Sequence, residues 1–476
     1  MANILSSLIS SSNALNTYDQ VLQVSQNNVA NSSTPGFVKH RQSLLALPFD
    51  PAIGLTGGVR AGEVQSARST YADQTVRRQL VQLGYAEQQV ETLSSLQSIF
   101  DISGDSGIPR ALNDLNRSFS AWAQSPGDTV ARQKVLDGAG AVSAAFQQTA
   151  AALGNAQQEA ERGVRNTVNR VNTLTAQLRD LNTLALQGSK ADSGLDAQIH
   201  ATLEQLSEDV SITAIEHENG SVDVLLNGQT PLVVGDQQYQ LHTGLYQPPD
   251  AAYPNASASV RVLGSDGSDI TAQIDTGKLG ALLDVRNRLL PSYLGDGDQQ
   301  GDLNRMAQQF ADRVNAVLIA GNIADGAPPT PGVPLFTYGA DPAAIARTLS
   351  AAPLQPGDLA AIAPGPPYVS NGVPMALSDL ASPQDPADRI DGSSYAQFYG
   401  FLAARAGSAL SDAQGRLAIQ QSAVAQTKNL RDQMSGVSLD EEAAILIQFQ
   451  RAYEANSRLI TVLDQLSQDT INILQR

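Results

Sequence analysis

Four consecutive residues have the sequence of a loop that carries a nucleophilic serine in some hydrolases. They are Gly104-Asp105-Ser106-Gly107. A serine of that type needs a histidine to accept its proton and an aspartate to orient the histidine, and only His40 precedes it. The flanking residues have helical spacing and cysteine is absent, so a loop between two helices is the favoured interpretation.

Two further groups contain residue types that bind metal ions. The segment 296–301, Asp-Gly-Asp-Gln-Gln-Gly, begins like a calcium-binding loop, but its twelfth position is Ala307 instead of a bidentate glutamate, which favours a capped turn. His217-Glu218 and His242 could share a metal ion, although two solvent-facing histidines on strands are the commoner case. The sequence has no P-loop, dinucleotide-binding fingerprint or zinc-protease motif. We therefore predict no enzyme, no cofactor and no metal site.

The composition excludes further classes of function. The chain has 476 residues, with 30 Lys and Arg against 47 Asp and Glu, which gives a net charge of −17. Such a surface repels nucleic acids and anionic membranes, so we predict neither as a partner. Cysteine is absent, which excludes disulfides and thiolate metal sites. No apolar run could span a bilayer, and residues 1–18 lack the basic segment of a cleavable signal peptide.

The N-terminus predicts a long amphipathic helix. Apolar residues recur at alternating spacings of four and three, the coiled-coil pattern, with Ser11 and Ser25 at two seam positions. The helix is expected to end before Pro35-Gly36, because proline cannot continue it and glycine permits a tight turn. The apolar seam residues are Ile4, Leu8, Leu15, Tyr18, Leu22 and Val29.

The C-terminus predicts a second long helix with two apolar stripes. It begins at Ser438, a predicted N-cap, and Asp440, Glu441 and Glu442 occupy the first turn, where acids complement the helix dipole. An apolar face this wide suits packing against two or more neighbours, so we predict that the terminal helices assemble with other subunits. The first stripe is Ile445, Phe449, Ala452, Asn456, Leu459, Leu463, Leu466, Thr470 and Ile473, and the second is Leu446, Tyr453, Ile460 and Leu474. The residues expected to form the assembly interface are Leu8, Leu15, Leu22, Leu446, Tyr453, Leu459, Ile460 and Leu463.

The rest of the chain predicts a mainly α fold with a β-rich insertion. Helical spacing dominates the middle of the chain, whereas Asn219-Gly220 and Asn227-Gly228 separate short alternating segments that are typical of an antiparallel β-meander. Residues 321–390 hold 13 of the 23 prolines and predict an irregular connector. The predicted parts are a terminal coiled-coil domain (1–38 and 438–476), a helical bundle built from both chain halves (39–205, 276–325 and 395–437), the β-rich insertion as an outer domain (206–275) and a Pro/Gly/Ala-rich connector packed on the bundle (326–394).

Motifs at both ends of the chain resemble one protein family. Asn28-Val29-Ala30-Asn31 followed by Thr34-Pro35-Gly36-Phe37 closely resembles the N-terminal signature of the bacterial flagellar axial proteins, the rod, hook and hook-associated subunits. Residues 450–460 are similar to the matching C-terminal helix. Three further stretches resemble the hook-associated subunits of the first hook-filament junction, and hook and rod subunits lack them. They are residues 279–293, residues 334–336 and residues 435–443, which include Gly436, Asp440, Glu441 and Glu442.

The resemblance implies a non-enzymatic structural protein of the bacterial flagellum. It implies a layer between hook and filament that assembles through the terminal helices and is needed for filament assembly. The partners it implies are further copies of the chain, the hook protein, the second hook-filament junction protein and a flagellar export chaperone. It also implies secretion by the flagellar type III apparatus without a cleaved signal peptide.

Two alternatives remain open at this point. Another axial subunit, such as a hook or distal rod protein, would share both terminal signatures. A hydrolase or adhesin activity within residues 206–394 would be a function of a different class, although that segment shows no catalytic pair.

Overall fold

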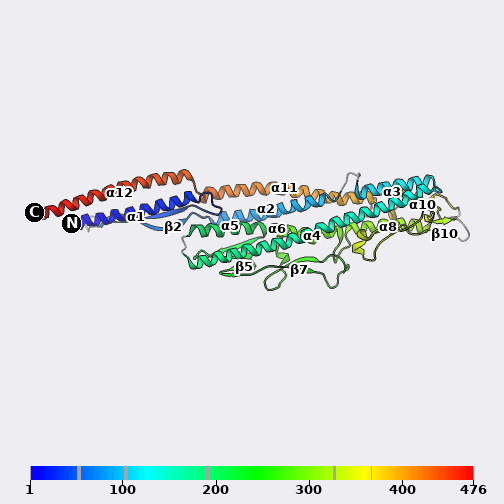
Figure 1. The fold of residues 1–476 in the computed structure, drawn as a ribbon, viewed down its shortest axis with the longest axis horizontal. Helices are drawn as coiled ribbons and strands as arrows, with labels where there is room; N and C mark the ends of the chain where they lie inside the picture. The colour runs from blue at the N-terminus through cyan, green and yellow to red at the C-terminus, as the bar shows by residue number, and fades with distance from the viewer. Residues whose placement is uncertain are drawn as a thin grey trace. The chain divides into compact units, whose positions relative to one another are not determined.

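The structure, a computed structural model, describes residues 2–50, 55–100, 106–188, 192–324, 329–365 and 367–474, with side chains for all of these except 2, 3 and 474. It is mainly helical with several small antiparallel sheets, as predicted (Figure 1). Two compact units are described separately. The first comprises Met1–Val81, Thr173–Tyr239 and Gln421–Arg476, and the second comprises Gln82–Asn172 and Gln240–Gln420.

Long helices form most of the first unit. Helices α1 (Ala2–Ala30) and α12 (Leu439–Leu474) lie side by side, and α5 (Ser193–Asp209) belongs wholly to this unit (Figure 1). Three helices contribute to both units, namely α2 (Thr70–Gln97), α4 (Thr129–Gln187) and α11 (Tyr395–Ser435). The predicted ends of the terminal helices are confirmed: α1 stops before Pro35, and the Glu441 N–H donates to the Ser438 Oγ at 3.4 Å at the start of α12.

A β-hairpin that the sequence analysis did not predict follows α1. Strands β1 (His40–Asp50) and β2 (Leu55–Ser66) pair antiparallel, with an irregularity between Gln42 and Leu44. The residues lie in a segment that was assigned to the helical bundle. The ribbon contacts α1, but none of the residues of either strand is fully buried, so the regular alternation of apolar and polar residues that marks a strand is missing.

The predicted β-meander is present as strands β3 to β6. They form one antiparallel sheet in sequence order, and Asn227 and Gly228 have positive φ angles of 47° and 74° at the turn that joins β4 to β5. Asn182 of α4 holds this sheet, because its amide donates to the Val222 and Gly235 carbonyls and accepts from the Val222 N–H, all at 2.8 to 2.9 Å. The strands are β3 (Ile212–Glu216), β4 (Val222–Leu226), β5 (Thr230–Val234) and β6 (Gln237–Gln238).

The remaining strands of the predicted insertion form a separate sheet in the second unit. Strand β7 (His242–Tyr246) pairs antiparallel with β8 (Ser259–Leu263). The predicted β-rich insertion therefore contributes one sheet to each unit.

The second unit has a helical core that draws on both halves of the chain. Aromatic residues from distant segments meet there, with ring centroids 4.9 Å apart for Phe100 and Tyr293 and 5.3 Å apart for Phe310 and Tyr395. The Pro-rich connector contributes buried residues such as Phe336 and Leu377 to the same core, together with only short elements. Besides β7, β8 and several short 3-10 helices, this unit contains α3 (Gly107–Gln124), α6 (Gly277–Asp284), the π-helix η2 (Val285–Leu289), α7 (Leu290–Leu294), α8 (Asp302–Ala320), α9 (Ile345–Thr348), α10 (Gly372–Asp379), β9 (Asn322–Ala324), β10 (Thr330–Pro331), β11 (Phe336–Thr337) and β12 (Ser350–Ala351).

Candidate functional site: the junction of the terminal helices

The two terminal helices form an antiparallel pair within the first unit. The rings of Tyr18 and Phe449 lie 5.7 Å apart, and the Asn456 side chain donates to the Ser11 carbonyl at 3.5 Å. The face of α1 that is most buried carries mainly small and polar residues, which allow close approach to α12 and to β2. These residues are Ser11, Ala14, Thr17, Val21, Ser25 and Asn28.

The N-terminal and C-terminal motifs meet at one buried carboxylate. Glu442 is 1% exposed, and its two oxygens accept hydrogen bonds from Ser25 Oγ at 2.5 Å and from Asn28 Nδ2 at 3.0 Å. Asn28 also bonds the backbone of His40 in both directions, at 2.8 and 3.0 Å. One asparagine thus ties the end of α1 to the start of β1 and to the start of α12.

The turn between α11 and α12 is fixed next to this carboxylate. The Lys39 N–H donates to the Ser435 carbonyl at 2.8 Å, and the Lys39 side chain pairs with Glu441 at 2.7 Å. The hydrogen bond from Lys39 lowers the pKa of the Glu441 carboxyl. A Cβ on Gly436 would lie 2.4 Å from the Asp432 carbonyl oxygen, so this position of the motif requires glycine.

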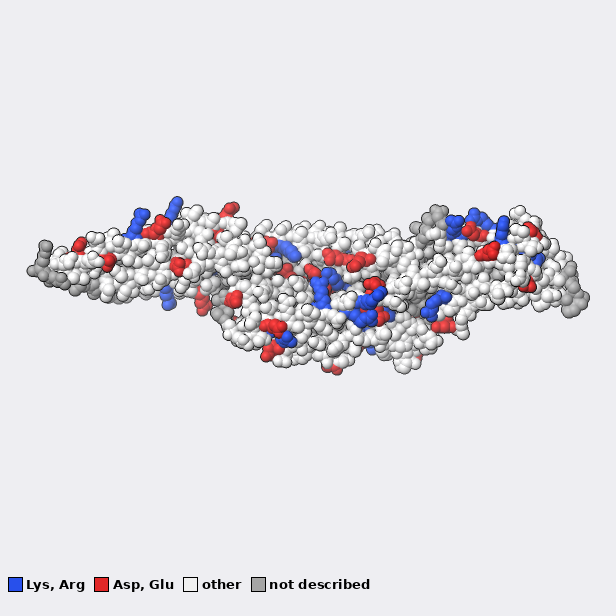
Figure 2. All heavy atoms as spheres, in the orientation of Figure 1, with Lys and Arg blue, Asp and Glu red and all other residues white. Residues whose placement is uncertain are grey.

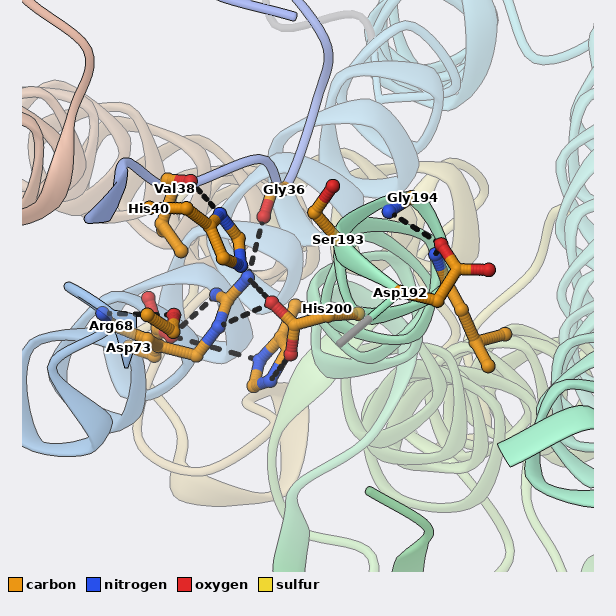
Figure 3. Close-up of polar contacts among 12 residues, drawn as sticks. Gly36, Val38, His40, Arg68, Asp73, Asp192, Ser193, Gly194 and His200 are labelled. Atoms are coloured by element: carbon orange, nitrogen blue, oxygen red, sulfur yellow. Dashed lines mark hydrogen bonds and ion pairs between the residues drawn. The ribbon is translucent and has the colours of Figure 1, made fainter. Parts of the chain in front are cut away.

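The Pro-Gly turn after α1 rests on α5. Gly36 has a φ of +77°, and a Cβ there would lie 2.3 Å from the Ala197 carbonyl oxygen. Its own carbonyl accepts from Arg68 Nη2 at 2.7 Å, and Arg68 also bonds Asp73 at 2.9 Å and Asp196 at 2.7 Å (Figure 3). Arg68 thereby joins the turn to the start of α2 and to α5.

A buried histidine borders the Arg68 group. Three carboxylates surround it: His200 lies 3.6 Å from Asp73 of α2, 3.5 Å from Asp196 of α5 and 3.8 Å from Glu216 of β3. Burial lowers the pKa of His200 well below its usual value, and the guanidinium groups of Arg68, Arg77 and Arg431 lower it further. His200 is therefore neutral at pH 7.

The predicted interface residues occupy two environments. Most of them are half-buried along the edge of the helix pair, whereas Tyr453 and Leu459 are 39% and 48% exposed. The half-buried residues are Leu8, Leu15, Leu22, Leu446, Ile460 and Leu463. The predicted second stripe ends at Leu474, whose side chain lies outside the described residues.

An exposed apolar stripe runs along α12 beside the face that contacts α1. Its members stand at helical spacings of three, four and seven, and Ile473 is the most exposed at 74%. No described residue of the chain covers it. The stripe comprises Leu459, Val462, Leu466 and Ile473.

The other motif residues have local roles. Thr34 Oγ1 donates to Asn31 Oδ1 at 3.2 Å, and the Phe37 ring lies 5.6 Å from the His40 ring. Asp440 is exposed in the first turn of α12. Sequence reasoning did not identify several residues that complete the junction, because nothing local distinguishes them from surface polar residues. They are Lys39, Arg68 and Asp196.

The residues considered for chemistry are in other environments. Gly104 and Asp105 lie outside the described residues, and Ser106 is the N-cap of α3. The Asp296 carboxylate accepts from the N–H groups of residues 298 and 299, as a capped turn does. His217 bonds Asp223 at 2.8 Å. Within the described ranges, no three His, Asp or Glu side chains are grouped so that they could hold a metal ion.

Comparisons with known proteins identify relatives of both the middle and the end of the chain. Residues 93–336 match the sequence profile of the flagellar hook-associated protein FlgK helical domain, and residues 431–473 match that of the flagellar basal body rod FlgEFG protein C-terminal region. Flagellar hook-associated protein 1 of Bacillus subtilis is 27% identical over 96% of both chains. The protein of the same name from Escherichia coli is 23% identical over 68% of this chain and 59% of its own length.

A solved structure has a similar fold. The flagellar hook junction protein FlgK from Burkholderia pseudomallei superposes with a TM-score of 0.64 at 15% identity, over 77% of this chain and 100% of that one. At this identity the likeness concerns the fold.

We expect the buried carboxylate to be essential for the helix junction. Glu442→Ala leaves the Ser25 hydroxyl and one Asn28 donor without their buried acceptor, which costs about 2–3 kcal/mol of unfolding free energy. Denaturant unfolding of the full-length protein measures this loss. The neighbouring Asp440→Ala is the control, since that side chain is exposed and takes no part in the junction, and its unfolding midpoint should stay close to that of the wild type. Equal effects of the two variants would contradict the assignment.

We expect acidification to destabilise the first unit. The folded state keeps His200 neutral, whereas the unfolded chain binds a proton near the ordinary histidine pKa of 6.5, so stability falls as the pH drops below that value. One such histidine contributes up to about 1.4 kcal/mol per pH unit. Burial also lowers the pKa of His40, which adds to the effect with the same sign. Calorimetry between pH 5 and 8 should show a smaller slope for both His200→Phe and His200→Gln, and an unchanged slope in both would refute this explanation.

Proposed function

Because the chain belongs to the flagellar hook-associated protein FlgK family and has a structural role at the hook-filament junction of the bacterial flagellum, we propose that its copies form a layer there through α1 and α12. The family match covers residues 93–336, more than half of the chain. The rod-protein match is confined to 431–473, a segment that an axial subunit of another kind would share. That difference favours the junction role over a hook or rod subunit.

The observation that carries the proposal is the exposed apolar stripe of α12. Three large side chains within it, Leu459, Val462 and Leu466, are each about half exposed in the single chain. Completing the burial of each one against a neighbouring helix stabilises an assembly by on the order of 1 kcal/mol. Leu5 and Ile9 of α1 are 63% and 54% exposed and extend the apolar surface of the pair. The neighbours we propose are further copies of the chain, the hook protein and the second hook-filament junction protein.

We propose that the protein reaches this place by flagellar type III export, without a cleaved signal peptide. The chain has no cysteine, so it can pass through a channel unfolded and refold without disulfide chemistry. None of the helices in the described ranges has the length and hydropathy that a membrane-spanning helix requires. The role we propose is structural and involves no catalysis.

The charge distribution accords with assembly through apolar surfaces. On the face drawn in Figure 2, basic side chains stand among acidic ones instead of forming a continuous basic surface. Together with the net charge of −17, this gives little attraction for a polyanion.

A complementation experiment tests the assembly surface. In the source bacterium with the gene deleted, wild type should restore filaments, whereas Leu459→Asp should leave hooks without filaments and release flagellin into the medium, because a charge would enter the buried contact. The variant itself should appear in the medium, which shows that export is intact. Ser457→Asp adds the same charge at an exposed polar position of α12 and should restore filaments.

Other outcomes of this experiment are equally informative. Normal filaments with Leu459→Asp would refute the proposed stripe. Absence of hooks in the deletion strain would instead place the protein among the rod or hook subunits. Filaments in the deletion strain would refute the junction role.

We also propose that a flagellar export chaperone binds the last helix before assembly, when its apolar face has no partner. A chain truncated after residue 439 should lose co-purification with the chaperone, while the full chain keeps it. Full-length Leu439→Ser is the control. It changes an exposed apolar residue at the first position of α12, outside the exposed stripe, and should still co-purify with the chaperone. Undiminished co-purification of the truncated chain would contradict this assignment.

A further inference from the structure

A polar pocket lies in the first unit, away from the contact between α1 and α12. It occupies about 230 Å³ between α2, α5 and the start of β3. Two consecutive arginines of α2 line it, together with hydroxyl-bearing residues of α5 and of the segment that leads into β3. The lining residues are Gln74, Arg77, Arg78, Val81, Ser207, Ser211, Ile212, Thr213 and Ala214.

Arg77 lines this pocket without a hydrogen-bond partner among the described residues. The residue is only 6% exposed, yet no described residue forms a hydrogen bond or an ion pair with it. The guanidinium nitrogens of Arg77 are not among the fully buried polar atoms that lack a hydrogen bond, so they face the solvent of the pocket and can donate to an oxyanion there. The chain has 47 acidic residues against 30 basic ones, so the missing partner does not reflect a shortage of carboxylates.

Two of the three carboxylates whose charge acts on Arg77 are already paired with other arginines. Asp73 pairs with Arg68 at 2.9 Å, and Glu204 pairs with Arg431. Glu216 lies 3.8 Å from the neutral His200, and it acts on Arg77 through its charge without forming a hydrogen bond to it. Burial lowers the pKa of Arg77 although all three acids oppose that change.

We propose that this pocket is an oxyanion-binding site in which the Arg77 guanidinium holds a carboxylate or a phosphate group. The planar guanidinium offers paired N–H donors to the two oxygens of such a group. The exposed Arg78 adds a second positive charge at the mouth, and the Ser211 and Thr213 hydroxyls can donate further hydrogen bonds. The ligand is either a free inorganic anion or the acidic side chain of a second copy of the chain. The inference does not depend on the junction role.

Phosphate is the probe for the site. Full-length wild type in chloride buffer should bind inorganic phosphate saturably by calorimetry, and phosphate should raise its melting temperature more than sodium chloride of equal ionic strength does. Arg77→Gln should weaken phosphate binding by at least about tenfold, and Arg78→Gln by a smaller factor, because Arg78 is exposed and screened. Arg110→Gln, a 60% exposed arginine of α3, is the control and should bind as the wild type does.

The wild-type titration decides the proposal even if Arg77→Gln fails to fold. Absence of any phosphate effect beyond that of chloride would overturn it, as would unchanged phosphate affinity in folded Arg77→Gln. A second measurement distinguishes the two sources of the ligand once binding is established. Weaker self-association in phosphate, or in Arg78→Gln, identifies the acidic side chain of a second copy as the occupant, whereas unchanged self-association identifies a free anion.

Discussion

The buried carboxylate of Glu442 is the constraint on which the arrangement of the chain ends depends. A carboxylate that is removed from water must have its oxygens hydrogen-bonded, and here Ser25 and Asn28 supply the donors from a helix more than 400 residues earlier. Only one register of α1 against α12 brings those three residues together. The carboxylate therefore fixes the pairing of the terminal helices, and with it the positions of the apolar stripes.

A second constraint connects the helix pair to the rest of the first unit. Gly36 lies so close to α5 that no side chain fits, and Arg68 bonds both its carbonyl and Asp196 of α5. The close contact of Gly36 with α5 and the hydrogen bonds of Arg68 both fix this turn. The turn therefore sets the direction of β1 relative to α1. The motif Thr34-Pro35-Gly36 thus has a packing role in addition to ending a helix.

Features that depend on neighbouring residues were predictable from the sequence, whereas features that depend on contacts between distant residues were not. The limits of α1 and α12 were predictable, because proline, glycine and the Ser438 cap act on neighbouring residues. The hairpin of β1 and β2 was not, since none of its residues is fully buried and its sequence carries no regular alternation. The acids at 440, 441 and 442 look alike in sequence, and only the fold shows that the third is buried. The division into the predicted domains and the role of the predicted interface residues stay predictions.

The distribution of residue sizes in the helix pair also explains why its leucines are incompletely buried. The predicted seam held Leu8, Leu15 and Leu22 together with Ser11 and Ser25, and the structure buries the two serines and Ala14 more deeply than the leucines. Small residues allow close approach and hydrogen bonds that specify register, yet they bury little apolar area. The contacts therefore specify one register of α1 against α12 but contribute little to the stability of the pair. Its larger apolar side chains remain at the edges, where a neighbouring helix can complete their burial, so specificity within the subunit and stability of an assembly depend on different residues of the same two helices.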